Sequence, residues 1–415
     1  MSKLQKSTSK VVDKCQISGS KDLKSIVFLG YHPPVNDYVK IGSFPEEKPS
    51  YPCELLYCEE SQLVQLGLIV NAEILFPKEY PYTSSTTKIL RENFRELYNE
   101  ASQILDLKKD DLIIDIGSND GNLLSNFKEK HRVLGVTPEE IGNLAIEKGI
   151  PTIIDYFNEE VVEKILVEYG KARVITATNV FAHIDEPNKI TNLISKLLTD
   201  DGVFISESHY LASLVETLQY DTIYHEHLRY YSLSSLNYLL EQNNLKSFYA
   251  KKIPTHGGSI RVYSSTKTDR PIDKSIEALL AEEKELISFE RLMKFKEDVL
   301  NSKIKLMSLI NEIKTSGSRI YGISSPSRAS TLVNYVGLDG GIIECIVEVE
   351  GSYKIGKYMP GTRIPVLEET ILYEKQPEYA LLFSWHIADE LIPKIKKNGY
   401  RGKFIIPLPE PRIVD

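Results

Sequence analysis

The sequence predicts an α/β protein with a small loop-rich N-terminal module, a central doubly wound domain and a smaller C-terminal α/β domain. Strand-like and helix-like patterns alternate through the middle of the chain, as in parallel sheets covered by helices on both faces. The alternation resumes near the C-terminus. The 415 residues also exceed the roughly 100–200 of a single domain. We place the domains at residues 1–85, 86–270 and 271–415.

The N-terminal module is rich in Pro, Tyr and Ser, and turn-forming stretches separate its short apolar runs. Cys15 and Cys58 are each followed three residues later by a serine, so two CxxC-like knuckles read CQIS and CEES. Four Cys or His side chains normally hold a structural zinc ion. The sequence therefore leaves open a zinc site that uses Cys15, Cys58 and Cys53, and a metal-free module stabilised by its apolar runs.

The other two domains are predicted from their apolar patterns. An amphipathic helix is expected over residues 90–105, and one or two long connecting helices over residues 272–313. The expected strands of the central domain are LIIDI, RVLGV, PTIID, ARVITATNV and GVFISES. Those of the C-terminal domain are SRIYGIS, IIECIVE, YALLFS and KFIIPL.

The turn after the first central strand carries two glycines, in the sequence IDIGSNDGNLL. Ligands of open α/β sheets bind beyond the carboxyl ends of the strands, and glycine allows backbone to approach them closely. The spacing differs from the GxGxxG fingerprint of dinucleotide sites, so we predict S-adenosylmethionine, with a ligand-free tight turn as the alternative. The expected cofactor-binding residues are Asp115, Gly117, Ser118, Asn119, Asp120, Gly121, Asn122 and Leu123.

The second central strand normally ends in an acidic residue that accepts hydrogen bonds from both ribose hydroxyls. Here Thr137 occupies that position, with Glu139 and Glu140 nearby. A threonine can hold one hydroxyl but offers no charge-assisted contact. We therefore expect a lowered cofactor affinity unless Glu139 reaches the ribose.

Histidines and tyrosines gather after the later strands, in NVFAHID, DTIYHEHLRYYS and IPTHGGSIRVY. Carbon methylation beside a carbonyl needs a base and hydrogen-bond donors for the developing enolate oxygen. We expect His227, with Glu226 nearby, to be the base, Tyr224 to be an oxyanion donor or proton shuttle, and His183 to be a second donor. His225 and His256 are assigned to substrate binding.

Other interpretations of these residues stay open. His225 and His227 could bind a metal, although a spacing of two fits a strand or loop better than the helix of a zinc hydrolase. Tyr224 and Tyr230 could be core aromatics whose hydroxyls find a partner. Tyr80 and Tyr82, in KEYPYTSST, could reach the substrate or lie in a surface turn.

Composition excludes several classes of partner. The formal net charge is −8 and no basic block is present, which argues against binding to nucleic acid or anionic lipid. No apolar run approaches the roughly 18–20 residues of a membrane span. The N-terminus lacks the apolar stretch of a secretion signal, so a cytoplasmic location is expected. The sequence is silent on oligomeric state.

The motifs CQIS, CEESQLVQL, YPYTSST, IDIGSNDGNLL, NVFAHID, DTIYHEHLRYYSL, IPTHGGSIRVY and PEPRIV resemble the sugar C-methyltransferase family of deoxysugar biosynthesis, nearly end to end. This resemblance implies S-adenosylmethionine-dependent methylation at C3 of a nucleotide-linked 4-keto-deoxysugar. It also implies a zinc-binding N-terminal domain, a central class I methyltransferase domain, and a C-terminal Rossmann-like domain that helps to hold the nucleotide sugar.

The resemblance assigns roles to particular residues. The family's catalytic groups match Tyr80 or Tyr82, His183, Tyr224, Glu226 and His227, and Asn179 matches a residue beside the methyl donor.

The sequence also departs from the family pattern. Serines replace two zinc cysteines, Thr137 replaces the ribose-binding glutamate, and SSPSRAS replaces a small-residue loop, where Arg328 could bind a phosphate. Trp385-His386 stands where the family has Trp-Asn. A cofactor-independent isomerase or epimerase of keto-sugars and a non-catalytic nucleotide-sugar binder remain alternatives.

Overall fold

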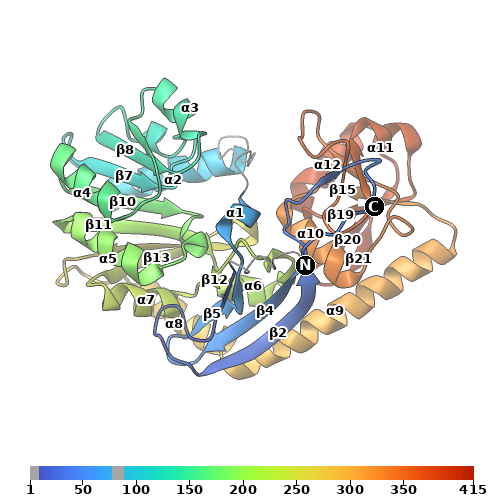
Figure 1. Ribbon diagram of the computed structural model, residues 1–415, viewed down its shortest axis with the longest axis horizontal. Helices are drawn as coiled ribbons and strands as arrows, with labels where there is room; N and C mark the ends of the chain where they lie inside the picture. Colours follow the sequence, from blue (N-terminus) through green and yellow to red (C-terminus); the bar gives the residue numbers. More distant parts are fainter. Residues whose placement is uncertain (1–8, 77–87) are drawn as a thin grey trace, which may run out of the picture.

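The computed structural model describes residues 9–76 and 88–415 (Figure 1). The predicted tyrosines Tyr80 and Tyr82 lie outside these residues. We describe the fold in three parts that follow the predicted domain division, which itself stays a prediction.

The N-terminal module contains two longer antiparallel strands, β2 and β4, among its loops and short strands. Its main sheet has the order β12-β5-β4-β2, and the last two strands curve across the lower middle of the molecule (Figure 1). Alternating buried side chains in these strands explain the curved, half-covered sheet. The elements are β1 (Lys10–Val11), β2 (Leu23–His32), β3 (Val39–Lys40), β4 (Tyr51–Cys58), β5 (Leu63–Leu66), β6 (Leu68–Ile69) and α1 (Ala72–Leu75).

The central domain contains a seven-stranded sheet in the order β13-β14-β11-β10-β7-β8-β9. All five predicted strands are present, and they pair in parallel. The last two strands are antiparallel, because the connection between them, residues 254–258, is too short for a parallel crossover. The strands are β7 (Leu112–Ile116), β8 (Arg132–Thr137), β9 (Thr152–Ile154), β10 (Ala172–Thr178), β11 (Leu198–His209), β12 (Arg229–Tyr230, in the N-terminal sheet), β13 (Lys246–Ile253) and β14 (Ser259–Ser265).

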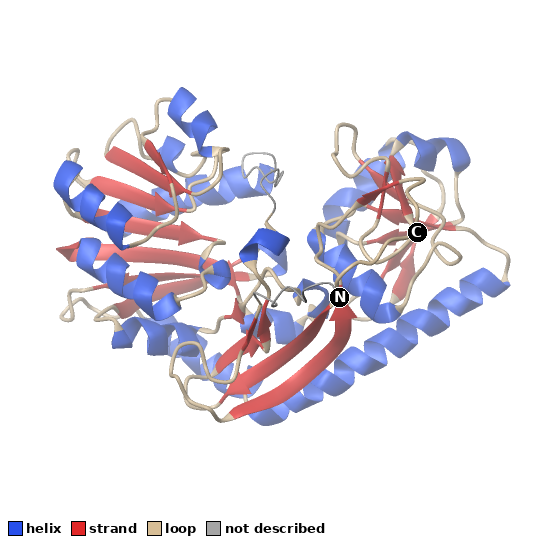
Figure 2. Ribbon diagram, viewed as in Figure 1, coloured by secondary structure: helices blue, strands red, loops and turns tan. Residues whose placement is uncertain are grey.

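Helices pack around this sheet (Figure 2). The helix expected over residues 90–105 is confirmed as α2, which buries one apolar face. The α-helices are α2 (Lys88–Ile104), α3 (Gly142–Glu147), α4 (Glu159–Glu168), α5 (Pro187–Leu197), α6 (Leu211–Glu216) and α7 (Leu233–Gln242). Short 3₁₀ turns are η2 (Leu124–Asn126), η3 (Phe181–His183), η4 (Tyr220–Thr222) and η5 (Thr255–Gly257).

Two connecting helices, α8 (Lys274–Leu286) and α9 (Phe289–Thr315), confirm the helical prediction for residues 272–313. The break between them is fixed by Ser288, whose side chain accepts a hydrogen bond from the backbone of Arg291 and caps α9. The long α9 runs along the base of the molecule to the C-terminal domain (Figure 1).

The C-terminal domain contains an eight-stranded sheet in the order β21-β20-β19-β15-β16-β18-β17-β3. Its outermost strand, β3, comes from the N-terminal module and pairs with β17. The strands are β15 (Ile320–Ile323), β16 (Ile346–Glu348), β17 (Lys357–Tyr358), β18 (Pro365–Glu368), β19 (Tyr379–Leu382), β20 (Lys403–Ile406) and β21 (Arg412–Val414). The helices are α10 (Ser327–Val336), α11 (Thr370–Lys375), η6 (Trp385–Ile387) and α12 (Ala388–Lys397).

One continuous apolar core joins the three parts, since a single cluster of buried side chains includes Cys15, Ile114 and Phe404. Side chains from all three parts can therefore be held at fixed positions in one site. Among the described residues, no helix is both long and apolar enough to span a bilayer.

Candidate active site

The turn after β7 has the tight geometry that its glycines predicted. Gly117, Asn119 and Gly121 have φ angles of 73°, 49° and 76°. A Cβ on Gly117 would lie 2.3 Å from Cγ2 of Val180, so only glycine lets this turn lie against the end of β10. The backbone can therefore approach a ligand at the carboxyl ends of β7 and β10.

Two of the predicted cofactor residues are occupied by contacts within the protein. Asp115 is buried and accepts a hydrogen bond from Thr176 Oγ1 at 2.6 Å, and burial raises its pKa to about 7. The buried carboxylate of Asp120 pairs with Lys148 Nζ at 3.2 Å. The Asp115 carboxyl therefore stabilises the end of β7, and the Asp120 carboxylate stabilises the turn that follows it.

Other polar atoms near the turn lack a partner. Within the described part of the chain, Ser118 Oγ, Asn122 Nδ2 and Asn179 Oδ1 are buried without a hydrogen bond. Such atoms are uncommon in native proteins and are often satisfied by a ligand. Asn179 follows β10 and has a φ of 57°, a conformation that a structural role alone does not require. This donor set fits a polar cofactor such as S-adenosylmethionine.

The end of β8 carries an acidic group despite Thr137. Thr137 Oγ1 donates to Glu139 Oε2 at 2.6 Å, with the threonine buried and the glutamate exposed. Glu139, two residues beyond the end of the strand, therefore places a carboxylate beside Thr137. This is the alternative that the sequence left open for Glu139.

The predicted histidines form a cluster around His227. The rings of Tyr224, His183 and His209 have centroids 4.3, 5.1 and 5.2 Å from that of His227. His256 continues the row, 5.6 Å from His209. His209 was missed by the sequence reasoning, although its place at the end of β11 is the position where such domains build their sites.

The histidine cluster is uncharged at neutral pH. Burial, and then neighbouring His183, lower the pKa of His227 to about 3, and burial lowers that of His256 to about 4. His227 Nδ1 lies 3.1 Å from the carbonyl oxygen of Thr222. A carbonyl can only accept, so Nδ1 carries the proton and Nε2 keeps a free lone pair. His227 thus presents an unprotonated nitrogen in a buried cluster of histidine and tyrosine rings.

The neighbours of His227 in sequence lie in different environments. Glu226 Oε1 accepts a hydrogen bond from Asn36 Nδ2 of the N-terminal module at 2.8 Å, and its backbone carbonyl accepts one from His183 Nδ1. His225 lies away from the cluster, with Nε2 3.1 Å from the Pro52 carbonyl. The assignment of His225 to substrate binding was therefore wrong, because a turn at residues 224–227, closed by the hydrogen bond from His227 N–H to the Tyr224 carbonyl, separates the two rings.

Arg328 lies in a buried interdomain network. Its guanidinium donates to both carboxylate oxygens of Asp221, at 2.9 and 2.8 Å, and to Gln219 and His386. Trp385 Nε1 donates to the same carboxylate at 2.8 Å. The prediction that Arg328 binds a phosphate finds no support here, since Asp221 already neutralises its charge.

A different cation is available beside the cluster. The half-buried Lys354 lies over the rings of Tyr38 and Tyr353, with Nζ 5.8 and 5.7 Å from their centroids, and donates to the Ser325 carbonyl. No carboxylate lies within ion-pair distance of it in the described ranges. Sequence patterns gave no sign of this lysine.

The two knuckles of the N-terminal module do meet. Cys15 Sγ lies 3.1 Å from Ser61 Oγ, and Cys58 Sγ lies 3.6 Å from Ser18 Oγ. Two thiols and two neutral hydroxyls do not match the Cys or His set that structural zinc requires. No cluster of three His, Cys, Asp or Glu side chains among the described residues could hold a metal.

The third cysteine that the sequence proposed as a metal ligand lies apart from the knuckles. Cys53 donates to the Ile223 carbonyl, and its proposed part in the metal site was wrong. The knuckles are therefore joined by hydrogen bonds between side chains, and zinc does not fit the residues present.

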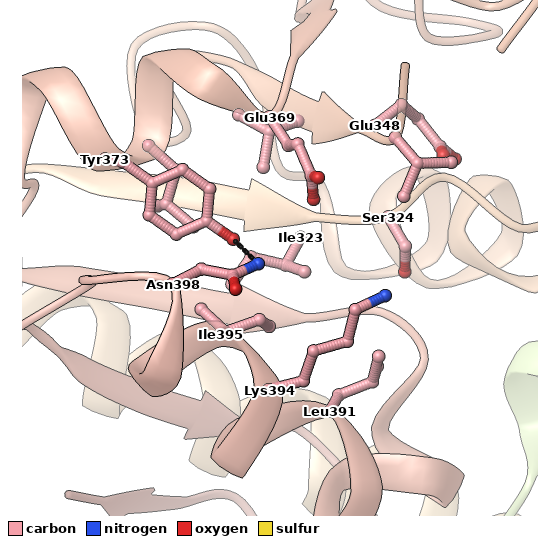
Figure 3. Close-up of a pocket in the computed structure, with 12 residues that line it drawn as sticks. Ile323, Ser324, Glu348, Glu369, Tyr373, Leu391, Lys394, Ile395 and Asn398 are labelled. Atoms are coloured by element: carbon pink, nitrogen blue, oxygen red, sulfur yellow. Dashed lines mark hydrogen bonds between the residues drawn. The ribbon is translucent and has the colours of Figure 1, made fainter. Parts of the chain in front are cut away.

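A separate cavity lies within the C-terminal domain, between the sheet and α12 (Figure 3). Its volume is about 70 Å³, well below the roughly 300 Å³ of small-molecule pockets. Glu348, Glu369, Ser324 and Lys394 face it, and a hydrogen bond joins Tyr373 and Asn398 at one side (Figure 3). It is too small for a cofactor and contains no member of the histidine cluster.

Comparison with known proteins identifies the family. Three family models match, described as a putative zinc binding domain over residues 15–76, a methyltransferase domain over residues 87–248, and a C-methyltransferase C-terminal domain over residues 254–409. The C-methyltransferase NovU of Streptomyces niveus is 30% identical over 411 residues, which is 97% of each chain. The chain belongs to the C-methyltransferase family.

Solved structures of S-adenosylmethionine-dependent enzymes share part of this fold. A methyltransferase of Clostridium acetobutylicum ATCC 824 is 14% identical, with 44% of this chain and 94% of that chain covered and a TM-score of 0.34. The magnesium protoporphyrin IX methyltransferase of Synechocystis PCC 6803, solved with bound S-adenosylmethionine, is 13% identical, with 42% and 78% covered and a TM-score of 0.32.

Membership of the C-methyltransferase family confirms the predicted family, fold class and cofactor, S-adenosylmethionine. The enzyme is an S-adenosylmethionine-dependent C-methyltransferase. The isomerase and the non-catalytic binder that the sequence left open are thereby set aside.

Proposed function

We propose that this enzyme methylates a nucleotide-linked 4-keto-deoxysugar at C3, by base-catalysed enolisation followed by methyl transfer. The observation that carries the proposal is the neutral His227, whose Nε2 lone pair lies in a buried cluster with Tyr224 and His183. A general base must be unprotonated before it removes a proton from carbon beside a keto group, and His227 meets that requirement at neutral pH.

Each residue has one task in the reaction. His227 Nε2 takes the proton from C3 as the C–H bond breaks, and the electron pair moves toward the 4-keto oxygen. Tyr224 donates a hydrogen bond to that oxygen and stabilises the enolate. Neutral His183 already uses its single N–H on the Glu226 carbonyl, so the donor role predicted for it does not fit this structure. Glu226 stabilises the positive charge that develops on His227. Carbon C3 then bonds to the methyl group that bound S-adenosylmethionine would supply, the bond from that methyl to sulfur breaks to leave S-adenosylhomocysteine, and the carbonyl re-forms.

The turn after β7 and Asn179 would hold the cofactor, with Thr137 and Glu139 at its ribose. The family resemblance adds Tyr80 or Tyr82 to the substrate side, and His256, whose buried Nε2 has no partner among the described residues, is suited to a sugar hydroxyl.

Lys354 supports the nucleotide-linked character of the substrate. Its ammonium group forms no direct ion pair in the described part of the chain, although the charges of Glu348 and Glu226 act on it, and it lies beside the turn between β15 and α10. A diphosphate could contact this ammonium group with a charge-assisted hydrogen bond. We assign the phosphate contact to Lys354 in place of Arg328.

Mass spectrometry tests the proposal directly. A panel of nucleotide-linked keto-sugars is incubated with enzyme and S-adenosylmethionine, and one of them is expected to gain a single methylene. His227→Ala should abolish the exchange of the substrate C3 proton with solvent deuterium. Methylation of none of the nucleotide-linked sugars, or of the free sugar equally well, would contradict the proposal.

A further inference from the structure

The N-terminal module forms one wall of the candidate active site. The segment that contains Glu226 and His227 continues into β12, which pairs with β5 of the module in an antiparallel ladder. The backbone N–H of Leu66 also donates to the Leu228 carbonyl at 3.0 Å. The residues just after His227, from Leu228 to Tyr230, therefore lie along the edge of the module's sheet, although they belong to the central domain in sequence.

Asn36 is the module residue that contacts a proposed catalytic side chain. It follows β2, is half-buried, and donates from Nδ2 to Glu226 Oε1 at 2.8 Å. Its Oδ1 accepts a hydrogen bond from Tyr353 Oη of the C-terminal domain at 3.1 Å. The orientation of the amide is thus defined, because an ionised carboxylate can only accept.

Tyr353 remains a donor across the working pH range. Burial, and then the charge of Glu226, raise its pKa to about 12. In the chain Tyr353–Asn36–Glu226, each residue therefore donates a hydrogen bond to the next. The chain runs from the C-terminal domain through the N-terminal module to the central domain. The His183 hydrogen bond holds the backbone of Glu226, and the Asn36 hydrogen bond acts on its side chain, which also lies within reach of the positive charge of Lys354.

We propose that Asn36 is a positioning residue, which holds the Glu226 carboxylate in place as the middle member of a hydrogen-bonded chain from Tyr353 of the C-terminal domain. A donor to a carboxylate favours its charged form. This inference rests on the proposed role of Glu226 in stabilising the charge on His227. It gives the N-terminal module a part in the reaction that does not depend on a metal.

The test uses the rate of solvent deuterium exchange at the substrate carbon, measured against pH in the full-length enzyme. Asn36→Asp replaces the donor with a second carboxylate, which should raise the pKa of Glu226 by roughly one unit or more. The acid limb of the profile should move to higher pH by the same amount, and exchange at the pH of the wild-type half-point should fall about fivefold for a shift of one unit. A purely structural role would lower the rate without moving the limb.

Asn188→Asp is the matched control. Asn188 joins the central domain to the N-terminal module through a hydrogen bond to the Ile17 carbonyl at 2.9 Å and does not contact Glu226. The pH profile of Asn188→Asp should keep its acid limb at the same pH as the wild-type enzyme. Calorimetry should give the same S-adenosylmethionine affinity for both variants.

The outcomes separate this inference from the proposed function. An Asn36→Asp profile that superimposes on the wild-type one would overturn the role of Asn36 alone. Absence of exchange in the wild-type enzyme would overturn the proposed enolisation itself.

Discussion

Replacing Glu139 with glutamine is expected to weaken S-adenosylmethionine binding about tenfold. The carboxylate accepts from Thr137 Oγ1 at 2.6 Å through one oxygen, which leaves the other free for a ribose hydroxyl. Glutamine keeps the length of the side chain and removes the charge. The change therefore tests whether the exposed glutamate, two residues beyond the usual position, is the ribose ligand.

The magnitude follows from the kind of hydrogen bond that is lost. Bonds to charged groups contribute about 1.5–3 kcal/mol, and the exposure of Glu139 places it at the lower end, because water screens its charge. A loss of about 1.4 kcal/mol is tenfold in Kd. Thr137→Ala removes the tether and keeps the charge, so a smaller loss, about threefold, is expected.

Titration calorimetry with S-adenosylmethionine, and separately with S-adenosylhomocysteine, measures the effect at fixed pH and salt. Glu140→Gln changes the adjacent exposed glutamate and should bind like wild type. Thr137→Asp combined with Glu139→Gln should restore affinity, since it returns an acid to the strand end. Binding by Glu139→Gln within twofold of wild type, or an equal loss in Glu140→Gln, would refute the reasoning.

Three further predictions concern other parts of the protein. The double variant Ser18→Cys/Ser61→Cys would place four thiols together with Cys15 and Cys58. We expect atomic emission to find one tightly bound zinc ion per chain in this variant and none in the wild type. A double variant that folds without zinc would refute this geometry. Arg328→Met leaves Asp221 buried without its partner and should lower the free energy of unfolding by about 3–5 kcal/mol. Urea titration measures this loss, and a value below about 1 kcal/mol would contradict the role of the pair. Burial lowers the pKa of His225 to about 4, so the native state binds fewer protons than the unfolded state below about pH 6.5, and stability should fall as pH drops toward 4. Urea midpoints from pH 7 to 4 should fall less steeply in His225→Asn than in wild type, and equal slopes would count against this account.

The sequence by itself determined the main elements and the tight turn after the first central strand. Buried parallel strands are continuous apolar runs, so LIIDI and ARVITATNV could be recognised locally, as could the connecting helices from their apolar spacing. The glycine-bearing turn after LIIDI was predictable for the same reason, because its conformation depends on the residues at Gly117 and Gly121 themselves.

The tertiary structure decided which side chains meet. Asn36 and Glu226 are 190 positions apart, and Arg328 lies 107 positions from Asp221, so no local pattern relates the members of either pair. His225 was misassigned for a similar reason, since its contact with the Pro52 carbonyl, 173 positions away, is made only in the folded protein. The spacing of apolar residues shows which face of a helix or strand is buried. Hydrogen bonds and charge interactions form between elements that only the fold brings together.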